Sequence, residues 1–283
     1  MEFSVVIPIY HTASNSIKHI QSVITALQNK YTTFEIIFII DNNYVSANVQ
    51  ELFLLEMKYK CIKVHQLNKN YGQQFATLCG YYLASGDYIL TVDEDMTHYI
   101  PLACKTKAYT IYDVYYFYYN KDLMYESDIR KKLSNIYKSI IMKVVNLKRS
   151  STFRIISQSL RDKLISNKHI YWNIDVSIFN NTNSIGSEEI EHIDFSDNNS
   201  AYNYKKLFQM AFEIAYEHNT IFMNLIFAMV PAIIYFWKYH DTMRTTVVYI
   251  FFAVLITSIF VGLKILSPST TSKIKKALKQ KTI

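Results

Sequence analysis

Three acidic residues stand together directly after an apolar run. The segment LTVDEDMTH, residues 90–98, contains Asp93, Glu94 and Asp95. Carboxylates this close repel one another and lose solvation when partly buried, so the arrangement is costly unless a cation lies between them. At strand spacing Asp93 and Asp95 would point the same way, roughly 7 Å apart, and a turn would bring both around one divalent ion, with Glu94 facing away. An ordinary acidic turn is the alternative.

The chemistry suited to this triplet is divalent metal binding. Carboxylate oxygens favour Mg²⁺ or Mn²⁺, which take one or two protein carboxylates together with substrate phosphates and water. We therefore predict a metal-bound phosphate at Asp93 and Asp95.

A parallel sheet is expected to position these acids. Four apolar, β-branched runs alternate with helical patterns in the first hundred residues: SVVIPIY (4–10), FEIIFII (34–40), IKVHQL (62–67) and DYILTV (87–92). Strands that are apolar on both faces and separated by crossover-length segments predict parallel pairing with right-handed connections. Ligands of such sheets bind beyond the C-terminal ends of the strands. We expect the polar residues at those ends to share one rim: Tyr10 and His11, Asp41 to Asn43, Asn68 to Asn70, and Asp93 to Asp95.

Three further residues each allow two interpretations. Asp41 ends the second run and could accept hydrogen bonds from a ribose or a base edge, or cap the next helix. Gly72 opens a helical pattern, and its neighbouring amides could face an anion or only begin the helix. Arg154, in SSTFRIIS, could be a surface charge or a guanidinium that binds a diphosphate through two parallel hydrogen bonds. Spacing alone does not choose between these.

The charge distribution favours a membrane surface over nucleic acid. The formal net charge is +7, and lysines and arginines cluster in 130–149 and 264–281, beside apolar or amphipathic patterns. Two stretches carry no charge over eighteen residues each: TIFMNLIFAMVPAIIYFW (220–237) and TVVYIFFAVLITSIFVGL (246–263). That is about the shortest length that spans a hydrocarbon core of roughly 30 Å. A buried pair of soluble helices is the alternative.

These patterns divide the chain into four consecutive parts. Residues 1–201 form a cytoplasmic catalytic domain, within which 128–148 is a basic amphipathic helix lying either in the membrane interface or on the sheet. Residues 202–219 form a second interfacial helix, 220–266 a transmembrane hairpin, and 267–283 a basic tail. The lysines of this tail place it, with the domain, in the cytoplasm. We therefore expect a multi-pass protein of the inner (plasma) membrane.

Several enzyme classes lack their main signatures. The chain has no GxGxxG, Walker loop, GxSxG or HExxH, which argues against dinucleotide oxidoreductases, P-loop ATPases, serine hydrolases and zinc proteases. Its three cysteines form no CxxC and no even set, so neither a disulfide framework nor a zinc site is indicated.

Four segments in order resemble a known family: FSVVIPIYH, EIIFIIDNN, LNKNYGQQFATLCGYYLASGDYILTVDEDM and STFRIISQSLRDKL. Followed by two apolar spans, they resemble the family 2 inverting glycosyltransferases of the GT-A fold. The nearest branch is the polyprenyl-phosphate one, which includes dolichyl-phosphate mannose synthase, bactoprenol glucosyltransferase and undecaprenyl-phosphate aminoarabinose-type transferases. The resemblance implies an α/β fold with a Rossmann-like, mostly parallel sheet flanked by helices, followed by the interfacial helices and the hairpin.

The resemblance also assigns roles to residues. It implies that Pro8 and Tyr10 border a nucleotide pocket and that Asp41 binds the uridine or ribose part. Asp93 and Asp95 would form the DxD pair, with Asp93 at the ribose and Asp95 at the diphosphate-bound metal, Mg²⁺ or Mn²⁺.

Arg154 would meet the donor diphosphate or the acceptor phosphate and complete the catalytic set with Asp93 and Asp95. The implied reaction transfers a sugar from a nucleotide-sugar donor, UDP-linked, to a polyprenyl phosphate at the cytoplasmic leaflet. A phosphate acceptor is already ionised, so positioning and charge stabilisation would suffice without a strong base.

Two alternatives stay open. A sugar hydroxyl acceptor would need a base such as Glu94 or Asp95. A non-catalytic sugar-nucleotide-binding protein is the other, because the chain departs from the family pattern: it has His11 and Thr12 for Asn-Glu, Ile40 for an aspartate and Thr97 for a glutamine, and of a late RxxGxSxY element it keeps only Ser200 and Tyr202. The sequence also leaves a homo-oligomer open.

Overall fold

The computed structural model describes residues 1–10, 14–42, 47–119, 151–166, 174–190 and 269–278. All of them belong to one compact unit built from residues 1–126, 149–197 and 269–283, while a second unit comprises residues 127–148 and 198–268. The predicted helices at 128–148 and 202–219 and the predicted hairpin at 220–266 lie outside the described residues. Among the helices that are described, none combines the length and apolarity needed to cross a bilayer.

A seven-stranded sheet forms the centre of this unit, in the order β3-β2-β1-β4-β6-β5-β7. The strands are β1 (Phe3–Ile9), β2 (Phe34–Ile40), β3 (Ile62–Gln66), β4 (Tyr88–Thr91), β5 (Val114–Tyr119), β6 (Arg154–Ser157) and β7 (Ile185–Ile190). The first four pair in parallel, as predicted, and β5 pairs in parallel with β7. Only β6 runs antiparallel to both of its neighbours. The predicted α/β class with a mostly parallel sheet is confirmed.

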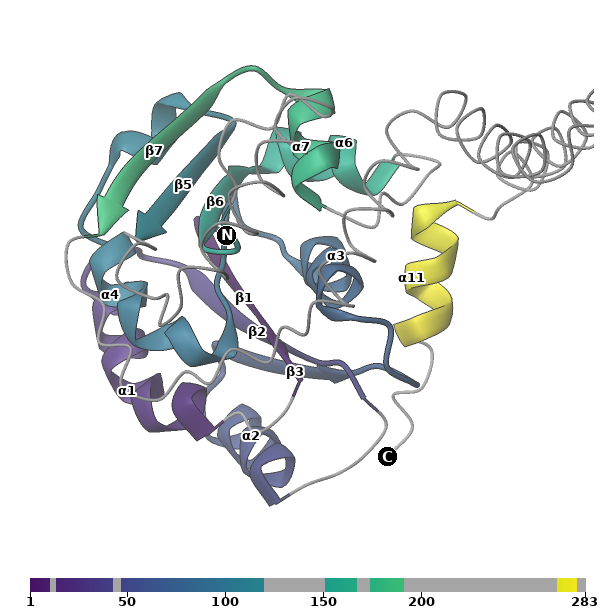
Figure 1. Cartoon of the computed structure of the whole chain (residues 1–283). Helices are drawn as coiled ribbons and strands as arrows, with labels where there is room; N and C mark the ends of the chain where they lie inside the picture. The colour runs from purple at the N-terminus through teal and green to yellow at the C-terminus, as the bar shows by residue number, and fades with distance from the viewer. Residues whose placement is uncertain (11–13, 43–46, 120–150, 167–173, 191–268, 279–283) are drawn as a thin grey trace, which may run out of the picture. The chain divides into compact units, whose positions relative to one another are not determined.

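Helices cover both faces of the sheet (Figure 1). One face packs on α1 (Ser14–Gln28), α2 (Ala47–Lys58) and α4 (Ile100–Ala103), and the other on α3 (Gln73–Leu83), α6 (Gln158–Ser166), α7 (Ile174–Asn181) and α11 (Thr270–Leu278). Two short 3₁₀ helices, η1 (Glu94–Tyr99) and η2 (Ala108–Ile111), flank α4. Each face therefore has its own buried apolar cluster, which explains why the central strands are apolar on both sides.

Pro8 is tolerated in the central strand β1 because the neighbouring strand β4 ends before it reaches this residue. β4 leaves the ladder after Thr91 pairs with Val6, and the last bond on that side runs from the Val92 amide to the Val6 carbonyl at 3.3 Å. Pro8 comes two residues later, where its missing N–H would face past the end of β4. No ladder hydrogen bond is lost, so a buried proline is tolerated at this position.

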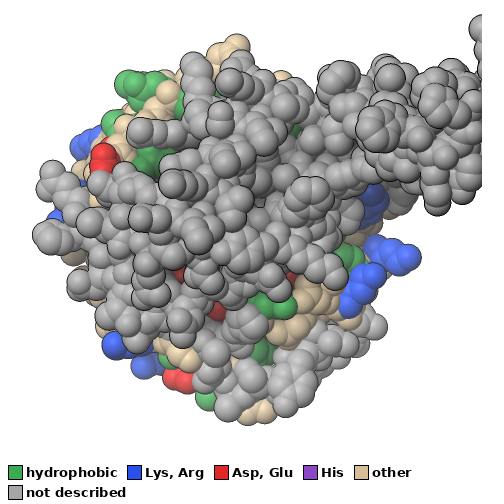
Figure 2. Space-filling model, viewed as in Figure 1, with side chains coloured by type: hydrophobic (Ala, Val, Ile, Leu, Met, Phe, Trp, Pro, Cys, Tyr) green, Lys and Arg blue, Asp and Glu red, His purple; other side chains and the backbone are tan. Residues whose placement is uncertain are grey.

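Part of the predicted basic tail at 267–283 is a helix packed on this unit. In α11, Ile274 and Ala277 are fully buried and Thr270 nearly so, whereas Lys275 and Lys276 are exposed. Lys and Arg side chains gather along the edge of the molecule where α11 lies (Figure 2). The lysines fit the predicted charge, but the apolar stripe at positions 270, 274 and 277 makes the segment part of the fold.

Candidate active site

The polar residues that follow β1, β2, β3 and β4 are linked at one edge of the sheet. The Tyr10 amide donates to Glu94 Oε2 at 3.3 Å, and the Asn42 side-chain amide donates to the Tyr10 carbonyl at 3.3 Å. Gln66, at the end of β3, donates through Nε2 to the Asn42 carbonyl at 3.1 Å. The predicted meeting of four strand ends at one rim is confirmed.

Asp41 is a buried carboxylate with an unsatisfied oxygen. Its side chain is fully buried, and Oδ1 accepts a hydrogen bond from the Tyr71 amide at 2.7 Å. Oδ2 has no hydrogen-bond partner among the described residues. Loss of water raises the pKa of Asp41 to about 6, although the amides of Tyr71 and Gly72 oppose the shift. A buried acceptor without a partner marks a place where a ligand donor would be stabilised.

Asp93 is held by two side chains from distant parts of the chain. Oδ1 accepts from the side-chain amide of Gln73, the first residue of α3, and Oδ2 accepts from Thr152 Oγ1 at 2.8 Å. Burial raises the pKa of Asp93 to about 6, and the charge of Asp95 raises it further, against the lowering effect of Thr152, Arg154 and Gln73. The carboxylate is thus fixed in direction while its negative charge is only partly compensated.

The turn after β4 places the other two acids on η1. Glu94 turns its carboxylate toward the Tyr10 amide, and its carbonyl accepts from Ser16 Oγ at 3.2 Å. Asp95 is exposed by surface area, yet neighbouring protein atoms remove enough water to raise the pKa of its carboxyl. The expected turn is therefore present, with the Glu94 side chain directed to β1.

The donor set at this turn fits a divalent ion shared with a substrate. Within the described ranges no group of three or more His, Cys, Asp or Glu residues could hold a metal on its own. Asp93 and Asp95 instead present two carboxylates whose pKa values are both raised, so extra positive charge would stabilise them. Mg²⁺ and Mn²⁺ commonly use one or two carboxylates and take the remaining ligands from phosphates and water.

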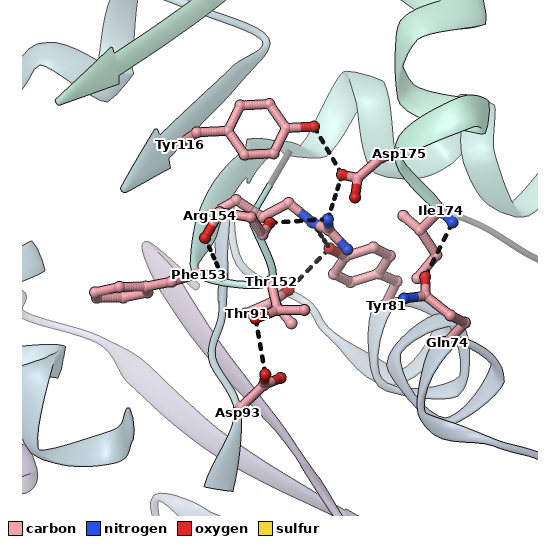
Figure 3. A network of polar contacts seen from close by, with 11 residues as sticks. Gln74, Tyr81, Thr91, Asp93, Tyr116, Thr152, Phe153, Arg154, Ile174 and Asp175 are labelled. Carbon is pink, nitrogen blue, oxygen red and sulfur yellow. Dashed lines mark hydrogen bonds and ion pairs between the residues drawn. The ribbon is translucent and has the colours of Figure 1, made fainter. Parts of the chain in front are cut away.

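Arg154 lies in a buried network on the face of the sheet that α3, α6 and α7 cover (Figure 3). Its Nη1 lies 2.5 Å from Asp175 Oδ1 on α7, and its Nε donates to Tyr81 Oη on α3 at 3.2 Å. Burial alone would lower the pKa of Arg154, but the Asp175 carboxylate, with Tyr81 and Tyr116, outweighs that effect and raises it. The Arg154 side chain is 1% exposed, and its described partners are all protein groups. Its direct contact with a phosphate stays a prediction.

The sheet register explains why these groups meet. Arg154 is paired directly with Thr91 of β4 on one side and Tyr116 of β5 on the other, so the three side chains share one face. Thr91 Oγ1 donates to Tyr81 Oη at 2.8 Å, and Tyr116 Oη donates to Asp175 Oδ1 at 2.9 Å.

The network also supports the rim. Arg154 Nη1 donates to the Ser151 carbonyl at 3.1 Å and so holds the residue before Thr152, whose hydroxyl orients Asp93. Arg154 is therefore suited to position an acidic residue of the rim from behind. Sequence reasoning missed Thr152 and Gln73, because single polar residues beside an apolar strand and at a helix start carry no distinctive spacing.

Pro8 and Tyr10 lie at the end of β1, and their predicted place beside a nucleotide pocket stays a prediction. Pro8 is buried inside the strand, whereas Tyr10 is 44% exposed just beyond it. Tyr10 is bonded to η1 and to Asn42, as described above, so it borders the same rim as Asp41.

Comparison with known proteins identifies this arrangement. Residues 4–163, more than half of the chain, match the family described as glycosyl transferase family 2. The chain belongs to this family. Among curated proteins, the undecaprenyl-phosphate 4-deoxy-4-formamido-L-arabinose transferase of Serratia proteamaculans (strain 568) is 29% identical over 93 residues, which cover 33% of this chain and 28% of that relative. The match thus spans under a third of that relative's length.

Two solved structures are similar to this chain in fold. Glucosyl-3-phosphoglycerate synthase from Mycobacterium tuberculosis, in complex with UDP, has a TM-score of 0.53 and 12% identity, covering 78% of this chain and 80% of that chain. The same synthase with Mn²⁺, UDP-glucose and phosphoglyceric acid has a TM-score of 0.52 at 12% identity, again covering 78% and 80%. At this identity the likeness shows a shared fold, which confirms the GT-A part of the predicted fold for this family 2 glycosyltransferase.

Proposed function

We propose that this family 2 glycosyltransferase is a membrane-anchored, inverting enzyme that transfers a sugar from a UDP-linked donor to a polyprenyl phosphate at the cytoplasmic leaflet of the inner membrane. The observation that carries the proposal is the rim itself. There the buried Asp41 keeps one oxygen without a described partner, next to the acidic turn of Asp93 and Asp95.

Asp41 is suited to bind the nucleoside part of the donor. Oδ2 of this carboxylate is buried and has lost its hydrogen bonds to water. A donor from the ligand, such as an imide N–H or a ribose hydroxyl, would therefore stabilise it. The Mycobacterium synthase was solved with UDP, and its shared fold supports a uridine nucleotide as the first candidate.

Asp95, with Asp93, would hold a divalent ion against the donor diphosphate. When bound, such an ion supplies positive charge to the departing diphosphate. The Mycobacterium synthase with Mn²⁺ and UDP-glucose supports this choice of ion. Residues of the chain itself do the rest: Thr152 and Gln73 fix the direction of Asp93, and Glu94 ties the turn to β1.

A lipid phosphate is the proposed acceptor. An oxygen of that phosphate forms a bond to the anomeric carbon from the face opposite the leaving group, while the bond from that carbon to the diphosphate oxygen breaks and its electrons leave with the diphosphate. The acceptor is ionised at neutral pH, so no protein base needs to take a proton. The Serratia relative is an undecaprenyl-phosphate 4-deoxy-4-formamido-L-arabinose transferase by name, which supports this class of acceptor.

Membrane anchoring is proposed from the sequence of 220–266, and the topology of the described unit fits a hairpin. β7 ends at Ile190 and α11 begins at Thr270, and both belong to the same compact unit. A chain that leaves this unit and returns to it must cross any bilayer an even number of times. Two spans, at 220–237 and 246–263, meet that condition.

The test is sugar transfer by membranes that contain the full chain. Radiolabelled nucleotide sugars are supplied with a short-chain polyprenyl phosphate and Mn²⁺, and the organic phase is analysed for a glycolipid. We expect a labelled polyprenyl-phosphate sugar with inverted anomeric configuration, absent when Asp95 is replaced by Asn. If none of the donors gives transfer to the polyprenyl phosphate, the proposal is rejected.

A hydroxyl acceptor is the second candidate, and the same assay separates it. Glu94 and Asp95 lie at the turn where a base would be needed, and each could accept a proton. Transfer of label to a lipid-linked glycan but not to free polyprenyl phosphate would favour this candidate. Uridine nucleotide binding that depends on Asp95, without turnover of any donor, would instead indicate a non-catalytic binding protein.

A further inference from the structure

The last described helix, α11, packs on the catalytic unit close to the proposed donor site. Its buried residues Ile274 and Ala277 join the apolar cluster formed by α3 and α6, and Thr271 Oγ1 donates to the Ile165 carbonyl at 3.2 Å. Figure 1 shows α11 beside α3. The helix therefore rests on the element whose first residue, Gln73, holds Asp93.

The C-terminal end of α11 is capped by the loop after β3. Helices leave their last carbonyls without partners, and these need outside donors. The Asn68 amide donates to the Ala277 carbonyl at 3.3 Å, and Asn68 Nδ2 donates to the Lys276 carbonyl at 3.4 Å. One residue of the loop thus receives its position from α11 through both backbone and side chain.

From Asn68 the contacts continue to Asp41. Tyr71 Oη donates to Asn68 Oδ1 at 2.8 Å, and the Tyr71 amide donates to Asp41 Oδ1 at 2.7 Å. The Tyr71 ring stacks on Phe75 of α3 with centroids 4.7 Å apart. The turn ends at Gly72, whose φ of 92° suits a residue without a side chain. Two residues, Asn68 and Tyr71, therefore connect α11 to the carboxylate proposed to bind the nucleoside.

We propose that α11 is a positioning element of the donor site. By holding Asn68, it fixes the Asn68–Gly72 turn in the conformation that directs the Tyr71 amide at Asp41 Oδ1 and leaves Oδ2 for the ligand. The inference rests on the proposed nucleotide site and adds to it the helix α11, which the sequence pattern assigned only to a basic tail.

The experiment compares two substitutions in the full-length protein in detergent or nanodiscs. Ile274→Asp places a charge in the buried stripe and should undock α11, whereas Ser272→Asp places the same charge on an exposed residue of the same helix. Hydrogen exchange reports the protection of the Asn68 and Tyr71 amides, and titration calorimetry with Mn²⁺ and UDP reports affinity.

We expect Ile274→Asp to remove protection at Asn68 and Tyr71 and to weaken UDP binding about tenfold, as the loss of one or two hydrogen bonds would. The donor KM should rise with little change in kcat. Ser272→Asp should keep both the protection and the affinity of the wild type.

A second variant keeps the proposal testable if Ile274→Asp fails to fold. Asn68→Ala leaves the apolar docking of α11 intact but removes the side-chain links to Lys276 and Tyr71, and it should weaken UDP binding several-fold. Wild-type UDP affinity in a folded Ile274→Asp variant with lost protection, or in Asn68→Ala, would overturn the role of α11. A wild-type protein that binds no UDP would overturn the proposed function itself, and with it the role of α11 at that site.

Discussion

Two acidic regions of the molecule are built differently: the rim with Asp41, Asp93 and Asp95, and the buried network around Asp175. At the rim, Asp41 has a buried oxygen with no described partner, and Asp93 and Asp95 face each other's charge. Behind the rim, Asp175 receives both Arg154 and Tyr116 within 3 Å. The rim carboxylates have raised pKa values, whereas the guanidinium of Arg154 has its charge stabilised.

The difference separates a ligand site from its support. A buried charge with a matched partner contributes to one arrangement of the fold, and removal of either partner leaves the other uncompensated. A buried charge without a partner lowers stability until something positive or a hydrogen-bond donor arrives. The rim is therefore expected to respond to substitution in activity, and the Arg154 network in stability.

The largest expected effect is on activity at the rim. Asp95→Asn keeps the shape of the side chain but removes the charge proposed to hold the metal, so the transfer rate should fall by about 10²-fold to 10³-fold. The free energy of unfolding should change by less than about 0.5 kcal/mol, because Asp95 is exposed. Transfer rates and thermal melting of this variant are compared with those of Asp87→Asn. Asp87 is exposed and precedes β4 at the end of the strand away from the rim, so this control should match the wild type. Equal loss in both variants would contradict the assignment.

The next effect is on stability behind the rim. Arg154→Met leaves Asp175 without its cation and should lower the free energy of unfolding by about 3–5 kcal/mol. Lys63→Met is the matched control, since Lys63 pairs with the buried Glu35 but is 44% exposed, and Glu35 keeps its bonds to Ser4 and Ser85. Its loss should be about 1 kcal/mol.

Denaturant unfolding of the Arg154→Met/Asp175→Leu double variant sharpens the comparison. If the pair is structural, the double variant should recover part of the stability that Arg154→Met loses. A stable Arg154→Met variant that has lost only activity would instead place Arg154 at a phosphate, as the family resemblance implies.

Asp41 should affect stability with the opposite sign. Its pKa is about 6 in the folded protein, above the ordinary value, so the ligand-free fold binds a proton more tightly than the unfolded chain does. Its contribution to stability is therefore present below about pH 4 and is lost as the pH rises through 6. Asp41→Asn should be more stable at pH 7 by about 1–3 kcal/mol, with a flatter pH dependence between pH 4 and 7.

The same substitution should weaken nucleotide binding about tenfold, because the ligand donor loses a charged acceptor. Unfolding curves across pH and UDP titrations measure the two effects together. An Asp41→Asn variant that is less stable than the wild type at pH 7 would show that Oδ2 has a partner in the folded protein.

The smallest effect is expected where the two regions touch. Thr152→Val removes the bond to Asp93 Oδ2 and should raise the pKa of Asp93 further, so activity should fall several-fold and more at pH 6 than at pH 8. Thr110→Val is the control, since that exposed hydroxyl donates only to the nearby Lys107 carbonyl. A pH profile that does not move would mean that Thr152 does not set the proton affinity of Asp93.

The parallel half of the fold could be predicted from sequence because its signals are local. Long apolar runs define β1 to β4, and the polar residue that ends each run identifies the rim, so Tyr10, Asp41 and Asp93 were placed correctly. The strands β5, β6 and β7 were not predicted; RIIS is too short to show a period, and IGSEEI is largely polar. The antiparallel place of β6 between β4 and β5 depends on pairing over long sequence separations.

The sequence by itself determined which strand ends carry carboxylates, because a strand's apolar run and the residue that ends it are neighbours in the chain. Only the tertiary structure decided which charges are already paired. Arg154 meets Asp175 across a helix and a strand, and α11 reaches Asn68 from 208 residues away. Both contacts depend on how the layers pack, and no local spacing in the chain encodes that distance.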